Sequence, residues 1–452
     1  MSNPAFAAII LAAGEGTRLN SAIPKVLHEL AGWPLIRHVT EALRPLGPAE
    51  TVVVIGRGME AVARAAAPAK TAIQSPPRGT GDAVRAARAG LQARLAKGDI
   101  ADVVVLFGDA ALLRPETIRA LLEERRRKPE AAIAAAGFRP PDPSPYGRFV
   151  LDPDGTLARI VEARDATPEE RGIGLCNGGI MAIDANHLFD LVDRIGNDNA
   201  KREFYLTDIV SIARAQRLLC RVAELPAEEL AGVNTRAELA EAEAILQQRL
   251  RRRAMENGAS LIAPDTVFLS ADTQLGRDVV IEPNIVFGLG VTIADNVRIR
   301  SFSHLDGATV ASGAIVGPFA RLRPGAVLEQ DVHVGNFVEV KATRLGAGAK
   351  ANHLSYLGDS EVGAGTNIGA GTITCNYDGF NKHRTVIGQN AFIGSNTAFV
   401  APVTVGDGAY VATGSVVTED VPTDALTIAR ARQANKPGRA AELKAKLRGK
   451  NR

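Results

Sequence analysis

The sequence is poor in the residues that cross-link chains or bind soft metals. Its 452 residues include three cysteines, Cys176, Cys220 and Cys375, and no pair has C-x-x-C spacing. We therefore expect neither a disulfide framework nor a metal cluster. We do expect the protein to occupy a reducing compartment.

A large net charge and a long apolar run are also missing. The formal net charge is +3, which gives no reason to expect nucleic acid as a partner, although anionic substrates would suit the basic residues described below. The apolar segment Ala5–Ala13 is too short to span a membrane and has no positive residue ahead of it. It predicts a buried first strand, and we expect a cytoplasmic protein that does not interact with a membrane.

Apolar and helical stretches alternate through residues 1–233, and the chain is too long for one hydrophobic core. This alternation predicts a Rossmann-like α/β domain with a mostly parallel sheet, in which ligands bind at the carboxyl ends of the strands. The predicted strands are Ala7–Leu11, Thr51–Ile55, Val103–Phe107, Ala131–Ala135 and Ile180–Ile183. The predicted helices are Ile36–Leu43, Gly81–Leu95, Pro115–Arg127 and Leu206–Arg214.

Residues 234–258 predict a linker helix. Thr235 and Glu238 have the spacing of a capping box, and Asn257-Gly258 is a stop signal. An apolar stripe follows at helical spacing: Leu239, Ala242, Ile245, Leu246 and Leu250. The basic run Arg251–Arg253 is read as a solvated helix end, with a nucleic-acid patch as the alternative.

Residues 259–452 show a six-residue period, which is neither the helix nor the strand period. This hexapeptide repeat predicts a left-handed parallel β-helix that sends one aliphatic side chain inward per strand. The three registers are Leu275, Ile281, Phe287, Ile293, Ile299, Leu305; Val310, Val316, Leu322, Leu328, Val334, Val340; and Ile387, Ile393, Phe399, Val405, Val411, Val417. The polar insert Asn376–Arg384 should loop out, and the hexad is lost beyond Val421, with a basic, helix-prone or frayed end at Ala440–Arg452.

A glycine-rich turn, Gly14-Glu15-Gly16, follows the first predicted strand, with Arg18 and Lys25 nearby. Glycine lets backbone N–H groups approach a phosphate, and the two cations complement its charge. The motif is neither a Walker loop nor a dinucleotide fingerprint. Asp109 follows the strand Val103–Phe107. It either contacts a ligand at the edge of the sheet or caps the helix that comes next.

Two cations in the repeat region, Arg323 and Lys341, are 18 residues apart. Three hexads complete one coil, so both side chains should lie on one face and could share a phosphate monoester. His353 follows, and the residues alone leave it open between a structural corner histidine and a general base.

Several of these motifs resemble a known enzyme family. Leu11–Arg18 with Pro24-Lys25 resembles the signature of sugar-phosphate nucleotidyltransferases. From about Ile9 to Arg430 the chain is similar to the bacterial bifunctional N-acetylglucosamine-1-phosphate uridyltransferases/glucosamine-1-phosphate acetyltransferases. The resemblance implies acetylation of glucosamine 1-phosphate by acetyl coenzyme A. Transfer of UMP from UTP then gives UDP-N-acetylglucosamine, a precursor of peptidoglycan and lipopolysaccharide, and releases pyrophosphate.

For uridylyl transfer, the resemblance implies Mg²⁺ held by Asp109 and Asn234, with Lys25 and Arg18 as catalytic cations. The residues it assigns to UTP and the sugar nucleotide are Leu11, Ala12, Ala13, Gly14, Lys25, Gln74, Gly79, Thr80, Gly147, Glu162, Asn177 and Asn234. As single residues, Glu162 and Asn177 are equally compatible with a structural role.

For acetyl transfer, the resemblance implies that His353 is the general base. Arg323, Lys341, Tyr356 and Asn367 would bind glucosamine phosphate. The residues that it assigns to acetyl coenzyme A are Ala370, Asn376, Tyr377, Ser395, Thr413 and Arg430. Cys375 suggests an acyl-enzyme, but the family pattern is direct attack by the amine. The family also implies a homotrimer formed through the β-helix.

The chain departs from the family pattern at a few positions. Ala111 replaces a common proline, Asp82 stands where histidine or a small residue is usual, Lys201-Arg202 replaces Gln-Gly, and Thr413 replaces the commoner alanine.

Two alternatives compete with the bifunctional reading. A single-activity nucleotidyltransferase with a regulatory β-helix, like ADP-glucose pyrophosphorylase, leaves Arg323, Lys341 and His353 unexplained. A scaffold without chemistry predicts damage at Lys25, Asp109 or His353, and all three are intact.

Overall fold

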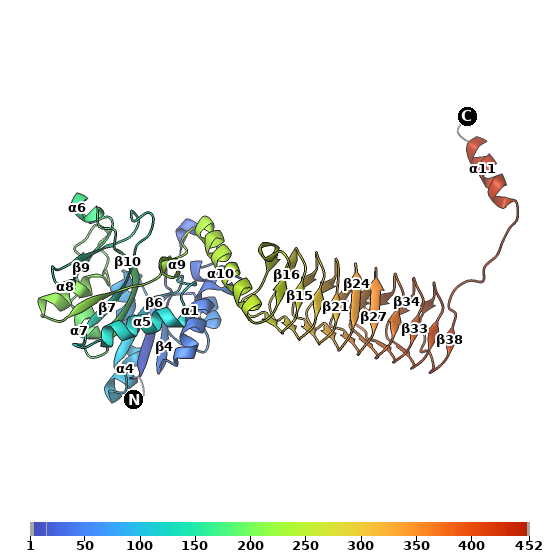
Figure 1. Ribbon diagram of the computed structural model, residues 1–452, viewed down its shortest axis with the longest axis horizontal. Helices are drawn as coiled ribbons and strands as arrows, with labels where there is room; N and C mark the ends of the chain where they lie inside the picture. Colours follow the sequence, from blue (N-terminus) through green and yellow to red (C-terminus); the bar gives the residue numbers. More distant parts are fainter. Residues whose placement is uncertain (1–3, 15, 450–452) are drawn as a thin grey trace. The chain divides into compact units, whose positions relative to one another are not determined.

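The computed structural model describes residues 4–14 and 16–449 (Figure 1). The chain folds into two compact units that meet in the sequence between Arg249 and Leu250. Within the described residues, no helix has the length and apolar character needed to cross a membrane.

The first unit is built on a sheet with the strand order β11-β7-β10-β6-β1-β4-β5, to which β8 and β9 are added from β10. Neighbouring strands of the β6-β1-β4-β5 group are parallel, as are β7 and β11, whereas β10 is antiparallel to β6, β7 and β8. The strands are β1 (Phe6–Leu11), β4 (Glu50–Gly56), β5 (Lys70–Gln74), β6 (Asp102–Phe107), β7 (Ile133–Phe138), β8 (Arg148–Leu151), β9 (Leu157–Val161), β10 (Cys176–Asp184) and β11 (Cys220–Glu224). A separate pair, β2 (Glu29–Leu30) and β3 (Trp33–Pro34), is antiparallel.

Helices cover both faces of this sheet because the strands are apolar on both sides. In β1, Ala7 and Ile9 pack into one core with α3, α4, α7 and α8, and Ala8 and Ile10 pack into a second core with α1, α2, α5 and α9. The helices of the unit are α1 (Leu35–Leu43), α2 (Glu60–Ala65), α3 (Thr80–Ala86), α4 (Arg88–Lys97), α5 (Pro115–Arg126), α6 (Pro168–Arg171), α7 (Leu188–Asp193), α8 (Asp208–Ala215) and α9 (Ala227–Leu230). The 3₁₀ turns are Thr17–Leu19, Lys25–Leu27 and Arg44–Leu46.

These elements confirm the predicted α/β class, with two differences. The predicted helix Gly81–Leu95 is interrupted at Ala87, so that α3 and α4 are separate. Four strands of the main sheet, β5, β8, β9 and β11, were not predicted, nor was the separate pair β2 and β3. Several of their residues are polar or exposed, as Lys70 and Thr71 are in β5, and an apolar-run criterion misses such strands.

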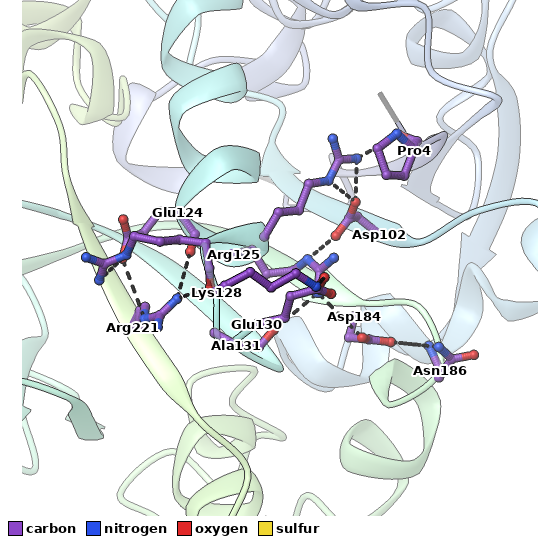
Figure 2. A network of polar contacts seen from close by, with 12 residues as sticks. Pro4, Asp102, Glu124, Arg125, Lys128, Glu130, Ala131, Asp184, Asn186 and Arg221 are labelled. Atoms are coloured by element: carbon purple, nitrogen blue, oxygen red, sulfur yellow. Dashed lines mark hydrogen bonds and ion pairs between the residues drawn. The ribbon is translucent and has the colours of Figure 1, made fainter. Parts of the chain in front are cut away.

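A buried ion network ties β6 to the end of α5 (Figure 2). Asp102 is 0% exposed and pairs with Arg125, which is 2% exposed, and with Arg126 at 2.5 Å. Arg125 also reaches Asp184 at 3.4 Å and donates to the carbonyl of Ala131 at 3.2 Å. Two guanidinium groups thus offset the cost of burying one carboxylate, and the network anchors the edge opposite the carboxyl end of β6.

The helix α10 (Arg236–Glu256) confirms the predicted capping box. The Glu238 N–H donates to the Thr235 hydroxyl at 3.2 Å, and the Glu238 carboxylate accepts the Thr235 N–H at 3.0 Å. The helix ends before Asn257, and Gly258 has a φ of +102°. Its apolar stripe packs in the first unit with a cluster that includes Leu30, Leu35, Ala111, Leu112 and Val233. The departure Ala111 is therefore a packing position.

The second unit is a parallel β-helix of three sheets. Their strand orders are β12-β15-β18-β21-β24-β27-β30-β33-β36-β38, β13-β16-β19-β22-β25-β28-β31-β34-β37 and β14-β17-β20-β23-β26-β29-β32-β35. The first sheet contains β12 (Ser260–Leu261), β15 (Val280–Ile281), β18 (Arg298–Ile299), β21 (Ile315–Val316), β24 (His333–Asn336), β27 (Lys350–His353), β30 (Asn367–Ile368), β33 (Phe392–Ile393), β36 (Tyr410–Val411) and β38 (Leu426–Thr427). The second contains β13 (Val267–Phe268), β16 (Ile285–Phe287), β19 (His304–Leu305), β22 (Arg321–Leu322), β25 (Glu339–Lys341), β28 (Tyr356–Gly358), β31 (Ile373–Cys375), β34 (Ala398–Val400) and β37 (Val416–Val417). The third contains β14 (Gln274–Leu275), β17 (Thr292–Ile293), β20 (Thr309–Val310), β23 (Val327–Leu328), β26 (Arg344–Leu345), β29 (Ser360–Val362), β32 (Thr385–Ile387) and β35 (Val403–Val405).

The predicted hexad residues form the interior of this prism. All are buried except Leu275, near its start, which is partly exposed. Full burial of one such aliphatic side chain contributes about 1.5–3 kcal/mol, so the ladders stabilise the coil cumulatively. The predicted insert at Asn376–Arg384 loops out, and Phe380 within it is 91% exposed.

Beyond the prism, α11 (Arg439–Gly449) confirms a helix at the basic end. The predicted end Ala440–Arg452 extends past this helix, and its last three residues lie outside the described part of the chain. The second unit also contains a 3₁₀ turn at Pro264–Thr266.

Candidate active sites

A cavity of about 680 Å³ opens at the carboxyl ends of β1 and β6 in the first unit. Such an edge is where open α/β sheets bind ligands. Most of the predicted nucleotide residues line it: Leu11, Ala12, Ala13, Gly14, Lys25, Gln74, Gly79, Thr80, Gly147, Glu162 and Asn177. Asp109 and Tyr146 line it too.

Cationic and oxygen-bearing side chains converge at one end of this cavity. Lys25 forms an ion pair with Asp109 and donates to the amide oxygen of Asn234 at 2.7 Å. Arg18 donates to the same oxygen at 2.7 Å. The backbone of Gly232 passes so close to Asp109 that an added Cβ would lie 3.2 Å from its Oδ2. The predicted residues Arg18, Lys25, Asp109 and Asn234 thus form one polar cluster. Asp109 and Asn234 both come 84 or more positions after Lys25 in the sequence.

The glycine turn requires its glycine at Gly16. This residue has a φ of +67°, and a Cβ there would collide with the side chain of Lys25. A glycine therefore allows the turn to pack directly against the lysine that contacts Asp109.

Gln74 sits at the end of β5 with its side chain held by two acceptors. Its Nε2 donates to the carbonyl of Gly79 at 2.9 Å and to Asp82 Oδ2 at 3.0 Å. Gly79 has a φ of +112°, and the Thr80 hydroxyl accepts the N–H of Leu206 at 2.9 Å. The departure Asp82 therefore lies behind the cavity wall, in contact with Gln74.

Glu162 also lines the cavity, where it accepts a hydrogen bond from the Thr207 hydroxyl at 3.0 Å. Burial raises the pKa of Glu162, and the Thr207 hydrogen bond and the Lys201 charge oppose that shift. Asn177 uses its amide oxygen to accept the N–H of Gly179 at 2.9 Å. Its amide nitrogen can then serve as a donor to a ligand.

The β-helix confirms that Arg323 and Lys341 share a face. The register pairs Leu322 with Val340, so the residues that follow them, Arg323 and Lys341, lie on successive coils. Each cation has a carboxylate partner: Glu339 lies 2.8 Å from Arg323, and Asp359 lies 3.3 Å from Lys341. A hydrogen bond from Arg323 to Glu339 raises the pKa of the arginine, which is ionised in any case.

Tyr356 and Asn376 join this cluster from the next coil and from the insert. Asn376 hydrogen-bonds Asp359 and lies 3.4 Å from the Tyr356 hydroxyl. Gly358 lies beneath both groups, and a Cβ there would be 2.4 Å from the Tyr356 hydroxyl. The predicted coenzyme residue Asn376 therefore also borders the sugar-phosphate set.

His353 ends β27, on the neighbouring sheet, and its side chain is exposed. Its Nδ1 lies 2.8 Å from the amide oxygen of Asn336, one coil away. Since this oxygen can only accept, Nδ1 carries the proton in the neutral ring and Nε2 is the basic atom. Leu354 and Ser355, at the corner, separate His353 from Tyr356.

Four predicted coenzyme residues, Ala370, Ser395, Thr413 and Arg430, follow His353 along its corner of the prism. The N–H of Gly371 donates to the His353 carbonyl at 3.3 Å, that of Asn396 to Ala370 at 2.7 Å, and that of Gly414 to Ser395 at 2.8 Å. The next coil places Thr413 beside Gly394, and Arg430 beside Gly414. Tyr377 lies in the insert, where Lys382 stacks over its ring at 4.9 Å.

Asn367 and Cys375 lie on different sheets of the prism. Asn367 lies on the sheet of His353, where it pairs with Lys350, and its contact with glucosamine phosphate stays a prediction. Cys375 is a free, exposed thiol at the end of β31.

Sequence reasoning also missed several residues of the two sites. In the second site these are Asn336, Glu339 and Asp359, and in the first Tyr205 and Thr207. Asn336 precedes His353 by 17 residues and Asp359 follows Lys341 by 18, so the one-coil spacing could have indicated both. Tyr205 and Thr207 come from an irregular segment, where no period exists to guide a prediction.

Two family models match the chain. A MobA-like NTP transferase domain matches residues 8–177, and six repeats of the bacterial transferase hexapeptide match residues 384–419. Among curated proteins, the chain is similar to "Bifunctional protein GlmU" of Paramagnetospirillum magneticum, with 52% identity over 100% of this chain and 99% of that protein. The proteins of the same name from Azorhizobium caulinodans (54% identity; 100% and 99% covered) and Xanthobacter autotrophicus (54%; 98% and 98%) are comparable.

Proposed function

Because the chain belongs to the GlmU family of bifunctional transferases, we propose that each of the two candidate sites carries out one of its two reactions. The protein acetylates glucosamine 1-phosphate with acetyl coenzyme A and transfers UMP from UTP to N-acetylglucosamine 1-phosphate, with release of pyrophosphate. In this proposal, the helix α10 is the linker of residues 234–258 between a uridylyltransferase domain and an acetyltransferase domain.

The cavity of the first unit would perform uridylyl transfer. The contact of Lys25 with both Asp109 and Asn234 carries this assignment, because it places a cation and two oxygen ligands beside the glycine turn. A phosphate oxygen of the sugar phosphate would attack the α-phosphorus of UTP, and the bond to the β-phosphate oxygen would break. Lys25 and Arg18 would offset the negative charge that accumulates on the phosphates.

Asp109 and Asn234 fit Mg²⁺ as its protein ligands. Their oxygens already converge on the ammonium group of Lys25, and hard cations prefer oxygen donors while retaining waters and substrate phosphates. Within the described residues, no group of three or more His, Cys, Asp or Glu side chains could hold a metal. The ion would therefore depend on the nucleotide for further ligands, and it would supply charge neutralisation when bound.

The corner of the β-helix would perform acetyl transfer. The hydrogen bond between Asn336 and His353 Nδ1 carries this assignment, because it leaves Nε2 free as a base. Nε2 would take a proton from the 2-amino group as its nitrogen attacks the thioester carbon, and the coenzyme A thiolate would leave. Arg323 and Lys341 would bind the 1-phosphate, exchanging their carboxylate partners for it. Ala370, Ser395, Thr413 and Arg430 would bind the coenzyme along the corner.

The active form would be a homotrimer assembled through the prism. An exposed aromatic ladder of Phe302, Phe319 and Phe337 supports this proposal. The three side chains are 54%, 45% and 55% exposed, and successive rings stack with centroids 4.9 and 5.1 Å apart. Leu354 extends the ladder beside His353. Contiguous exposed apolar surface is typical of an interface, and a neighbouring prism would cover it and enclose the site. The free thiols agree with a cytoplasmic location.

One experiment tests both assignments. The purified protein is incubated with glucosamine 1-phosphate, acetyl coenzyme A, UTP and MgCl₂, and products are scored by mass. We expect UDP-N-acetylglucosamine, coenzyme A and pyrophosphate. His353→Ala should abolish acetyl transfer and spare uridylyl transfer from N-acetylglucosamine 1-phosphate, and Asp109→Ala should do the reverse. Loss of both activities in either folded variant would contradict the two-site proposal.

A further inference from the structure

Asp82 lies directly behind Gln74 in the wall of the nucleotide cavity. Both side chains are nearly buried, at 9% and 5% exposure. One Asp82 oxygen accepts the Gln74 amide at 3.0 Å, and the other accepts Arg78 Nη2 at 3.0 Å. Gln74 therefore meets a carboxylate that is itself held in place by an arginine.

These contacts determine which way round the Gln74 amide lies. Its two neighbours, the Asp82 carboxylate and the Gly79 carbonyl, are both acceptors, so the NH₂ group must face them. With both of those hydrogens engaged in the wall, the polar atom that Gln74 can offer to a ligand in the cavity is its carbonyl oxygen. The side chain thus presents an acceptor.

An acceptor that faces the base of a bound nucleotide discriminates between pyrimidine bases. Uracil has an N–H donor at N3, whereas cytosine has a lone pair there. A fixed acceptor facing N3 forms a hydrogen bond with uracil and repels the lone pair of cytosine. Binding of cytosine would also leave buried polar groups unpaired, which opposes binding.

We infer that Asp82 is a positioning residue for base selection: by fixing the Gln74 amide, it makes the cavity select UTP over CTP. This inference rests on the proposed uridylyl transfer in the same cavity. Asp82 is also a position at which the chain departs from its family, where histidine or a small residue is usual, so the arrangement belongs to this chain's own residues.

Asp82→Asn is the informative substitution, because it keeps the size of the side chain. Arg78 favours the asparagine oxygen, which leaves the asparagine NH₂ facing Gln74 and favours the opposite orientation of the Gln74 amide. With N-acetylglucosamine 1-phosphate as acceptor, the ratio of kcat/KM for UTP to that for CTP should fall about tenfold, the size expected for one hydrogen bond. Asp82→Ala should lower the ratio less, since the Gly79 carbonyl still holds the amide.

Arg78→Ala is the matched control, because it removes the exposed partner of Asp82 and leaves the bond to Gln74. Its ratio should stay near that of the unmodified protein. An unchanged ratio in Asp82→Asn, or an equal fall in Arg78→Ala, would overturn the inference. Should Asp82→Asn fail to fold, as judged by thermal unfolding, Asp82→Ala decides by the same ratio. Absence of any UTP turnover in the unmodified protein would instead overturn the proposed function.

Discussion

Asn336 and His353 occupy the same position on successive coils of the prism, and a 2.8 Å hydrogen bond joins the amide oxygen of one to Nδ1 of the other. A backbone repeat thus sets the tautomer of the proposed base. The coil that brings the two side chains together is the one that buries the aliphatic ladders, so the chemistry depends directly on the regularity of the fold.

Loss of the Asn336 amide should slow acetyl transfer without affecting uridylyl transfer. In Asn336→Ala, the His353 ring can rotate and adopt either tautomer, so we expect kcat to fall about 10- to 100-fold. Asn336→Asp should restore the orientation but place a negative charge beside the ring, which favours the imidazolium. The acidic limb of its pH–rate profile should therefore move to higher pH. A profile identical to that of the unmodified enzyme would show that Asn336 has only a structural role.

Replacing Glu162 with glutamine should stabilise the first unit in a pH-dependent way. Burial raises the pKa of Glu162 in the folded protein, so the folded state holds that proton more tightly than the unfolded state. The contribution of Glu162 to the free energy of unfolding is then full at low pH and is lost as pH rises through the folded pKa. The advantage of Glu162→Gln should grow across that window and then level off.

Trp33 is the single tryptophan and belongs to the first unit, so its fluorescence in urea follows this transition. Glu169→Gln, at an exposed position on α6, serves as the control and should show no such trend. A pH-independent advantage for Glu162→Gln would contradict the role assigned to burial.

Adjacent residues of β34 should differ sharply in their effect on stability. Phe399 points into the prism and is 0% exposed, whereas Val400 points outward and is 42% exposed. Phe399→Ala should cost about 3–5 kcal/mol through lost burial and a cavity, and Val400→Ala less than about 0.5 kcal/mol. Far-UV circular dichroism in urea would follow the β-helix, with Trp33 fluorescence unchanged as an internal reference. Equal costs would mean that the hexad ladder is not the core.

Removing the carboxylate of Asp102 should destabilise the first unit strongly. Asp102→Ala leaves Arg125 buried without its nearest charge partner, which costs about 3–5 kcal/mol for such pairs. Glu130 contacts the same arginine at 3.6 Å from a side chain that is 42% exposed, so Glu130→Gln should cost under about 1 kcal/mol. Urea midpoints from Trp33 fluorescence would compare the two variants. A small loss of stability in Asp102→Ala would show that water replaces the carboxylate.

The sequence predicts the fold best where one period repeats. The hexads from Ile281 to Val417 all became interior positions because each coil repeats the same geometry. In the first unit, apolar strands such as β6 were predictable, whereas the polar edge strand β5 was not.

The candidate sites were predictable where side chains follow directly from a regular element. Asp109 follows β6, and Arg323 and Lys341 follow the coil repeat. Partners supplied by irregular segments, such as Thr207 for Glu162, have no local signal, because long-range packing alone brings them to the cavity.

The corner between His353 and Tyr356 has a consequence for how the enzyme responds to dilution. The base and the cations stand on two faces that meet at a convex ridge, and a ridge on an isolated prism leaves its substrate open to solvent on the outer side. In the proposed homotrimer, acetylation per chain would then decline steeply below the concentration at which the three copies dissociate, while turnover of UTP in the self-contained cavity would remain constant.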